Sequence, residues 1–351
     1  MAFTGATAGY QAAAQANDTA ISYAMEPTYG VPATGNYQRT RFTGENFKPT
    51  DTTQRPDEIN ADIEAAQAVL TQTSVAGTLS GALSYGTYDD MLAAVLGADW
   101  ASNTVQNGSV VKTWTLSEKI NGAWLVRPGS YCTRAQLTFA QGSFASIALD
   151  FSCKQQTQVT ADPATSYAAA PTGRVFDTVD NFVGMTIDGV APDGCVRQVQ
   201  ITLDRDGSAS DYGMGHADAC GIRPGQILAS GSLQIFFKTW DLYQRWSNGG
   251  QGPVAITVED ADGNSYVLTF LNATLRNPVI NAGSKNSSIV ATFDIEGNPQ
   301  AAVAHLALCA IPKRRPSRST RTTSQSAAHW SLHKGCDHDR ADKAAFCLAA
   351  K

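Results

Sequence analysis

Residues 80–89 read SGALSYGTYD, and 152 positions later residues 232–241 read SLQIFFKTWD. Each stretch alternates larger and smaller residues as a strand does, and then reaches a Thr, an aromatic residue and an Asp, which together are typical of a helix start. Chance likeness between two strand-helix units is the competing explanation. Because residue type, order and position all agree, the sequence predicts one β unit that occurs twice.

The two predicted helices begin directly after these stretches. Thr87 is the candidate N-cap of the first, Asp89 and Asp90 lie in its first turn where carboxylates complement the helix dipole, and Gly97 would end it. The side chains predicted to face the core are Met91, Leu92 and Val95 in the first helix and Leu242, Tyr243 and Trp246 in the second.

Short alternating runs separated by glycine-containing turns predict the remaining strands. These runs are residues 77–85, 110–116, 123–126, 134–139 and 144–151, followed by 184–187, 196–203, 227–237, 254–258, 266–270 and 288–295. The closing runs are also alike, since residues 146–151 resemble residues 288–293. Asn107-Gly108 and Asn121-Gly122 suit tight hairpins, and residues 59–70 fit either a helix or a long hairpin.

The pattern predicts a mainly β protein with two tandem domains, each with one short flanking helix. A Thr-, Ala- and Pro-rich segment with little to bury marks the boundary between them. The predicted divisions are an extended N-terminal arm (1–37), a first domain (38–153), a linker (154–175), a second domain (176–304) and a basic, disordered C-terminal extension (305–351).

Charge is divided unevenly along the chain. The net charge is −5, but residues 313–351 hold nine Lys or Arg against three Asp, which leaves residues 1–312 at −11. An acidic body repels phosphate backbones, so it argues against a protein that grips nucleic acid and suits a conduit along which DNA slides. Ordinary solubility explains the same acidity, and both interpretations stay open.

The cysteines and the start of the chain indicate where the protein works. Seven cysteines are spread without a CxxC pair in a chain of 351 residues, and we expect them to be reduced. The first residues, MAFTGATAGYQAAAQ, lack the basic and apolar regions of a signal peptide, and no run of 18 apolar residues occurs. We therefore expect neither export nor contact with a membrane.

Candidate chemistry is sparse, and we predict no catalytic, cofactor-binding or metal-binding residue and no enzyme activity. His216 lies near Cys220 in a glycine-rich segment without a nucleophile elbow, which favours a loop histidine. Asp204 to Gly207 and Asp260 to Asn264 resemble the start of a calcium loop but lack its full ligand spacing, so hairpin turns are favoured. The C-terminal residues His329, His333, Cys336, His338 and Cys347 fit no zinc module, and a disordered or frame-altered extension is favoured over a metal site.

Several segments, in this order, resemble the major tail tube proteins of siphoviruses, the bacteriophages with long non-contractile tails. The likeness covers about residues 20–300 and rests on residues 21–30 (ISYAMEPTYG), 41–45 (RFTGE), 83–92 (LSYGTYDDML) and 113–119 (TWTLSEK). The resemblance implies tail-tube-type β-sandwich or rolled-sheet domains whose inner sheets join across subunits. Exposed sheet edges would then be paired by neighbours instead of being left to aggregate.

The resemblance also implies a function by assembly. The chain would form stacked rings in the virion tail tube, the conduit for genome delivery, after assembly in the host cytoplasm. A duplicated subunit predicts trimeric, pseudo-hexameric rings, with hexameric rings as the second choice. The arm (1–37) and the polar loop (43–75) are the candidate stacking contacts. The lumen would be acidic or neutral. The other partners would be tape measure, terminator and distal tail proteins and transiently passing double-stranded DNA.

A glycan-binding β-sandwich or adhesin-like monomer is the alternative. Trp114, Trp124, Trp240 and Trp246 could form a carbohydrate platform, although they fall at positions expected to be in the core. Rings or tubes under negative stain would favour the tail tube, whereas a monomer that binds glycans would favour the alternative.

Overall fold

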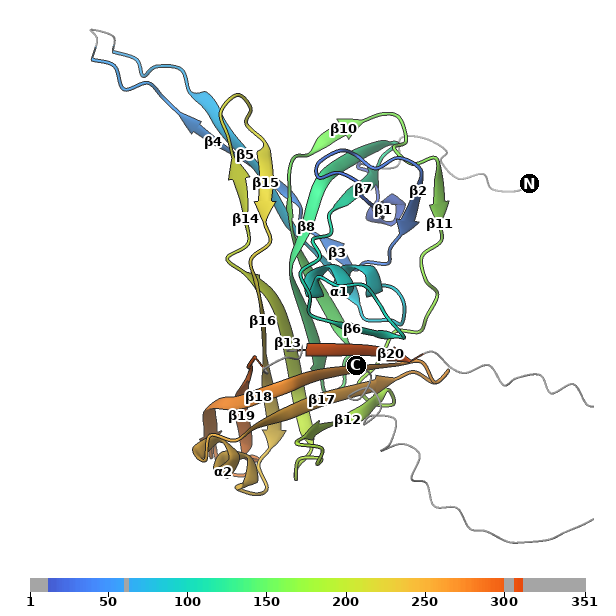
Figure 1. The fold of residues 1–351 in the computed structure, drawn as a ribbon, viewed down its shortest axis with the longest axis vertical. Coiled ribbons are helices and arrows are strands. Elements are labelled where there is room, and N and C mark those ends of the chain that lie inside the picture. The colour runs from blue at the N-terminus through green and yellow to red at the C-terminus, as the bar shows by residue number, and fades with distance from the viewer. Residues whose placement is uncertain (1–11, 60–62, 300–305, 312–351) are drawn as a thin grey trace, which may run out of the picture.

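A computed structural model describes residues 12–59, 63–299 and 306–311 (Figure 1). Within these ranges, eighteen strands form one continuous hydrogen-bonded sheet and two more form a separate hairpin, with two α-helices packed beside them. The prediction of a mainly β fold is confirmed.

The first half of the molecule, as we use the term, comprises β1 to β9 and α1. Its elements, after a short 3-10 turn (Ala16–Asp18), are β1 (Ala20–Met25), β2 (Asn36–Arg39), β3 (Gly44–Glu45), β4 (Lys48–Gln54), β5 (Val69–Ala82), α1 (Asp89–Leu96), β6 (Thr104–Gln106), β7 (Trp114–Ile120), β8 (Ala123–Ala140) and β9 (Ser146–Cys153).

Two short strands connect the halves, and the second half comprises β12 to β19 and α2. These elements are β10 (Thr157–Val159), β11 (Ser166–Ala168), β12 (Phe182–Ile187), β13 (Val196–Asp206), β14 (Ala209–Tyr212), β15 (Ala219–Arg223), β16 (Gln226–Phe236), α2 (Asp241–Ser247), β17 (Gln251–Glu259), β18 (Ser265–Asn281) and β19 (Val290–Gly297). A last strand, β20 (Leu306–Ile311), pairs with β18 and with β6.

The two halves share one topology. In the first half the neighbours in the sheet run β4-β5-β9-β8-β7-β1, and all of these pairs are antiparallel. In the second half they run β13-β16-β19-β18-β17-β12, again antiparallel, and the helix again follows the second strand of the series. The helices α1 and α2 also begin 152 residues apart, so the arrangement of strands and helices agrees with a unit that occurs twice.

The last strands of the two halves, β9 and β19, are equivalent at a different sequence offset from the one that their residue likeness suggests. Ser80 lies opposite Ala148 in β9, whereas Ser232 lies opposite Asp294 in β19. With Ser80 and Ser232 equivalent, β19 corresponds to β9 at an offset of 146, and the likeness of residues 146–151 to 288–293 is out of register by four. A shift by an even number preserves the alternation of a strand, so the pattern alone could not detect it.

Helix α1 is the most deeply buried element. Every residue from Met91 to Leu96 is buried, and Gly97 ends the helix in the left-handed conformation with φ 70°, as predicted. The predicted cap is wrong, because the N-cap is Tyr88 and makes no side-chain capping bond. Thr87 instead lies with its Oγ1 2.6 Å from the Oγ of Ser84, in the protein interior.

Three segments expected to lie outside the domains contribute strands. Residues 20–37, placed in the arm, include β1, where Ile21 and Tyr23 are core residues. The linker segment 154–175 includes β10 and β11, which pair with β8 and β2. The first residues of the C-terminal extension include β20, whereas residues 1–11 and 312–351 lie outside the described residues.

Several turns also differ from their predictions. Asn121-Gly122 does join the hairpin β7–β8, and residues 59 and 63–70 belong to the long hairpin β4–β5 and not to a helix. Asn107-Gly108 and Asp206-Gly207 follow β6 and β13 without joining two paired strands. The runs at 123–126 and 134–139 are one strand, β8, whose middle section, Val126–Cys132, is buried on both faces and so does not alternate.

Within the described ranges, no helix has both the length and the apolar character needed to cross a lipid bilayer.

Candidate assembly surfaces

The two halves join through a strand-to-strand seam. The C-terminal part of β8 pairs with β9 on one edge and with β13 on the other, from Gln198 opposite Ala140 to Asp204 opposite Arg134. The sheet therefore passes from the first half into the second without a break. In Figure 1 the long strands β8 and β13 lie side by side at this seam.

The C-terminal end of α1 is fixed to this seam. Arg205, at the end of β13, is buried and donates from Nε to the carbonyl of Val95 at 2.7 Å. A cation at a helix C-terminus is favourable because it meets the negative end of the helix dipole. Burial lowers the pKa of the Arg205 guanidinium below its usual value, and the bond to the helix compensates for part of the lost hydration.

The N-terminal end of α1 contacts the second half as well. The Tyr266 hydroxyl in β18 donates to the Asp89 carboxylate and accepts from the backbone N–H of Gly86 at 2.8 Å. Burial raises the pKa of Asp89, although the bond from Tyr266 opposes this shift, and burial raises the pKa of Tyr266 still further above its usual value. Both ends of α1 are thus held across the boundary between the halves.

Each half leaves the counterpart of this seam without a partner. Gly44 in β3 lies opposite Ser80, as Gln200 in β13 lies opposite Ser232, so residues 42–48 correspond to the β13 side of the seam. By the same comparison of strand partners, the C-terminal end of β18 corresponds to β8, the other side of the seam. Among the described residues, no strand pairs with the outer edge of β3 and β4, or with residues 275–281 on the edge of β18 that faces away from β19.

Two hairpins project from one end of the molecule. The strands β4 and β5 extend far beyond the body, and the small hairpin β14–β15 lies beside them (Figure 1), joined by a bond from the Thr73 N–H to the Ala217 carbonyl at 2.8 Å. Their ends expose Ile59, Ile63 and Met214 almost completely. The hairpin β4–β5 belongs to the polar loop 43–75 that we predicted as a stacking contact.

His216 lies beside Cys220, an arrangement that we judged conceivable from the sequence. Its Nε2 is 3.3 Å from the Cys220 Sγ, and its Nδ1 is 2.8 Å from a carboxylate oxygen of Asp218. Both the thiol and the imidazole are exposed near the turn of the β14–β15 hairpin, and neither lines the pocket beside Trp124 or the pocket beside α2. The imidazole is within hydrogen-bonding reach of the thiol.

Of the two calcium-like segments, Asp260 to Asn264 forms the predicted hairpin turn, whereas Asp204 to Asp206 belong to strand β13. The Asp260 carboxylate accepts from the backbone N–H groups of Asp262 and Asn264 and from the side chain of Asn264, so its oxygens are used within the β17–β18 turn. Asp204 lies in the ladder of the seam. In the described part of the chain, no three His, Cys, Asp or Glu side chains gather in a way that could hold a metal ion.

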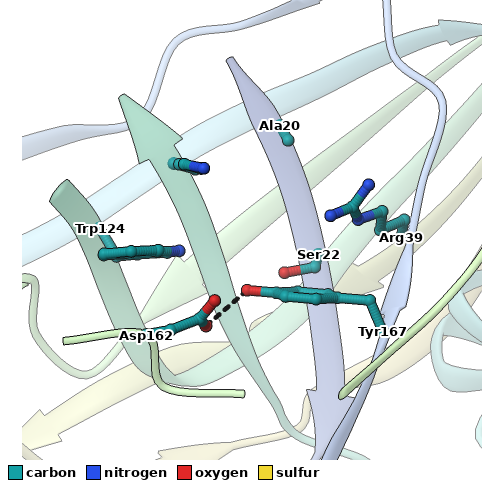
Figure 2. A pocket seen from close by; sticks show the side chains of 7 residues that line it. Ala20, Ser22, Arg39, Trp124, Asp162 and Tyr167 are labelled. Carbon is teal, nitrogen blue, oxygen red and sulfur yellow. Dashed lines mark hydrogen bonds between the residues drawn. The ribbon is translucent and has the colours of Figure 1, made fainter. Parts of the chain in front are cut away.

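The four tryptophans lie in different environments. Trp114 is buried against Tyr23, and Trp124 lines a small hollow (Figure 2) and has the Lys119 ammonium 5.5 Å from its ring centroid. Trp246 packs partly buried against the core, but Trp240 is 55% exposed beside α2, so its predicted core position is wrong. Arg39 lies over the Tyr167 ring, and the Tyr167 hydroxyl donates to Asp162 at 2.6 Å. At about 40 Å³ the hollow has room for water but not for a sugar ring, since ligand pockets usually exceed about 300 Å³.

A family model described as "Phage tail tube protein" matches residues 16–297, which span both halves. The chain belongs to the phage tail tube protein family. No curated protein matches it. A tail tube protein is a structural component of the virion tail that assembles with copies of itself and with other tail proteins, and the family is not enzymatic.

The surfaces that matter most in this tail tube protein were not identified from its sequence. The sequence predicted that edges would pair between subunits, but not which edges. The internal repeat was a usable signal. Once the strand pairing within one copy is known, the equivalence of strands in the two halves indicates which edges should pair between copies. Sequence alone gives no pairing order for antiparallel strands, so the seam between β8 and β13 could only be found in the structure.

Proposed function

We propose that three copies of the chain close into a pseudo-hexameric ring, and that rings stack into the tail tube of a siphovirus through which the genome is delivered. The observation that supports this proposal is the seam inside the chain. Its two sides, β8 and β13, have counterparts at β18 and β3–β4 whose edges are unpaired in the described ranges. A second copy offers the complementary edge to each, so the seam can repeat around a ring.

The number of copies follows from the number of seams. A ring of three chains has three seams within chains and three between them, six in all and similar in kind. Unpaired edges of this length would otherwise promote aggregation, and closure removes them. Hexameric rings remain the second choice and would contain twelve halves.

The register of the seam predicts which residues meet between copies. Gln200 lies opposite Thr138 within the chain. The counterpart of Gln200 is Gly44, because the two lie opposite the equivalent residues Ser232 and Ser80. The counterpart of Thr138 is Val279, because the two lie opposite the equivalent residues Ser146 and Thr292. We therefore expect Gly44 of one copy to lie opposite Val279 of the next.

Disulfide trapping tests this pairing. In a background with Cys195→Ser and Cys220→Ser, the pair Gly44→Cys and Val279→Cys should form covalent trimers on mild oxidation, because directly opposite Cβ atoms lie about 4.5–5.5 Å apart. The pair Asn46→Cys and Val279→Cys, shifted by two residues, should link poorly. Equal yields from both pairs, or a wild-type protein that stays monomeric at high concentration, would contradict the proposal.

The acidic body fits a conduit for DNA. Residues 1–312 carry −11, and we expect Asp and Glu to outnumber Lys and Arg on the lumen face. A map of the assembled tube with a strongly basic bore would refute this part of the proposal. Tape measure, terminator and distal tail proteins are the expected partners at the ends of the tube.

A further inference from the structure

A groove of about 340 Å³ lies beside α2 in the second half. Its apolar lining includes Val190, Ile235, Leu242 and Phe293. Its charged lining consists of two ion pairs, Asp193 with Lys238 and Asp188 with Arg245, both at 2.7 Å, and of Asp241. Helix α2 has no buried residue, whereas six consecutive residues of α1 are buried. The second helix is therefore left uncovered at a place where the first is covered.

The equivalent place in the first half is filled. Leu83 and Ala145 correspond to Ile235 and Ala291, which both line the groove. Between Leu83 and Ala145 lies Phe176, which is fully buried; its N–H donates to the Leu83 carbonyl at 2.9 Å, and its carbonyl accepts from the Ala145 N–H at 2.8 Å.

Phe176 comes from the segment that leads into the next unit of the sheet. It precedes β12, the first strand of the second half, by six residues. In a ring, the unit that follows the second half is the first half of the neighbouring copy, whose first strand is β1. The segment equivalent to that around Phe176 is therefore the segment that precedes β1, and 19 residues precede Ala20.

We propose that the groove beside α2 binds the segment preceding β1 of the neighbouring copy in the ring. The chemistry of the two surfaces agrees, since residues 1–19 include one charged side chain, Asp18, and two aromatic ones, Phe3 and Tyr10, which suit an apolar groove. In the single chain β16 and β19 pair directly along the groove, so the segment lies against this ladder and not within it. This inference rests on the proposed ring, because only there does a neighbouring copy follow the second half.

Two variants of matched exposure test the groove. Val190→Arg places a charge in the groove, and Val179→Arg places one on a comparably exposed valine that does not line it; their exposed fractions are 69% and 75%. A fluorescent peptide of residues 1–19 should bind a variant of the chain from which residues 2–11 are deleted. Val190→Arg should weaken this binding at least about tenfold, and Val179→Arg should leave it within about twofold, because a charge is costly to bury in an apolar site.

A second measurement uses the assembled ring. Deletion of residues 2–11 and Val190→Arg should each lower the temperature at which the ring dissociates, while the melting of the monomer stays unchanged. If the Gly44 and Val279 disulfide still forms but neither variant changes ring dissociation or peptide binding, the inference is wrong and the ring stands. If the disulfide does not form and no rings are seen, the proposed function fails first.

Discussion

Asp89 and Asp177 hold carboxylates in opposite environments. Burial raises the pKa of Asp89, whereas bonds from the backbone N–H groups of Asp180 and Val179 lower the pKa of Asp177. A raised pKa favours the protonated group in the folded state, so its contribution is fully present below the unfolded pKa and is lost as the pH rises. A group with a lowered pKa contributes stability that is fully present above the unfolded pKa and is lost as the pH falls.

We predict that the two Asp→Asn variants respond to pH with opposite sign. Relative to Asp89→Asn, the wild-type protein should lose stability as the pH rises from about 4 through the raised pKa of Asp89, by about 1.4 kcal/mol for each unit of pKa difference. Relative to Asp177→Asn, it should lose stability as the pH falls below 4. Denaturant melts of the three proteins between pH 3 and 7 check this, and parallel curves would contradict it.

The neighbours of Cys220 predict its reactivity. The His216 Nε2 lies 3.3 Å from the Cys220 Sγ, within hydrogen-bonding reach of the thiol, so Cys220 should react at pH 7 with iodoacetamide about tenfold faster than Cys195, which is also exposed. Mass spectrometry of the two peptides over time measures both rates in one sample. The variant His216→Ala should remove the difference, and equal rates in the wild-type protein would rule out assistance by the imidazole.

Glu26 shows what sequence reasoning could find at this scale and what it could not. The residue belongs to the segment that carries the family likeness, but its role appears only in the structure. It is buried, and its two oxygens accept from the N–H groups of Gly30 and Gly129 and from the hydroxyls of Thr113 and Thr115. Two of these donors are about 90 residues away along the chain, so no local pattern could reveal them.

At the scale of elements, the end of α1 depends on Gly97. This residue has φ 70°, and a Cβ there would collide with the Arg205 guanidinium at the seam. Gly142, in the β8–β9 turn, has nearly the same φ of 72° but open space around it. Comparing substitutions at these two glycines therefore separates the free-energy cost of the left-handed backbone from the cost of the steric clash.

We predict that Gly97→Ala destabilises the protein more than Gly142→Ala does. Both should cost about 1–2 kcal/mol for the left-handed backbone, and Gly97→Ala should cost at least about 1 kcal/mol more because Arg205 must move from the helix end. Equilibrium unfolding in urea gives both values. Equal losses would mean that the seam tolerates a methyl group at this position.

Elements were predicted best where local signals act alone. The end of α1 was found from Gly97, its start was predicted one residue too early from Thr87, and the alternating strands of both halves were found from their period. The N-terminal residues around β1 were assigned to an arm, because small polar residues surround only a few apolar ones. Ile21 and Tyr23 are nevertheless core residues, since β1 pairs with the nearby β2 on one edge and with β7, about 95 residues away, on the other.

For the whole molecule, the projecting hairpin β4–β5 separates two kinds of assembly. In the proposed ring the seam edges join neighbouring copies, whereas the hairpin extends beyond the body (Figure 1) and is suited to reach the next ring. Replacing residues 55–68 by a two-residue Asn-Gly turn should leave rings of three copies but prevent long tubes. Mass photometry and negative-stain images check the two outcomes, and tubes of normal length would exclude the hairpin as the stacking element.

The strand β8 of the first half pairs with β13 of the second, and this has a mechanical consequence. The β8–β13 ladder lies inside a single polypeptide, so its two sides stay tethered even when its hydrogen bonds break, and they can reform at once. In the proposed ring of three copies, the ladders between copies would have no such tether. A tube of such rings that swells or bends should therefore crack along three longitudinal lines and not six, and each fragment should be a whole chain.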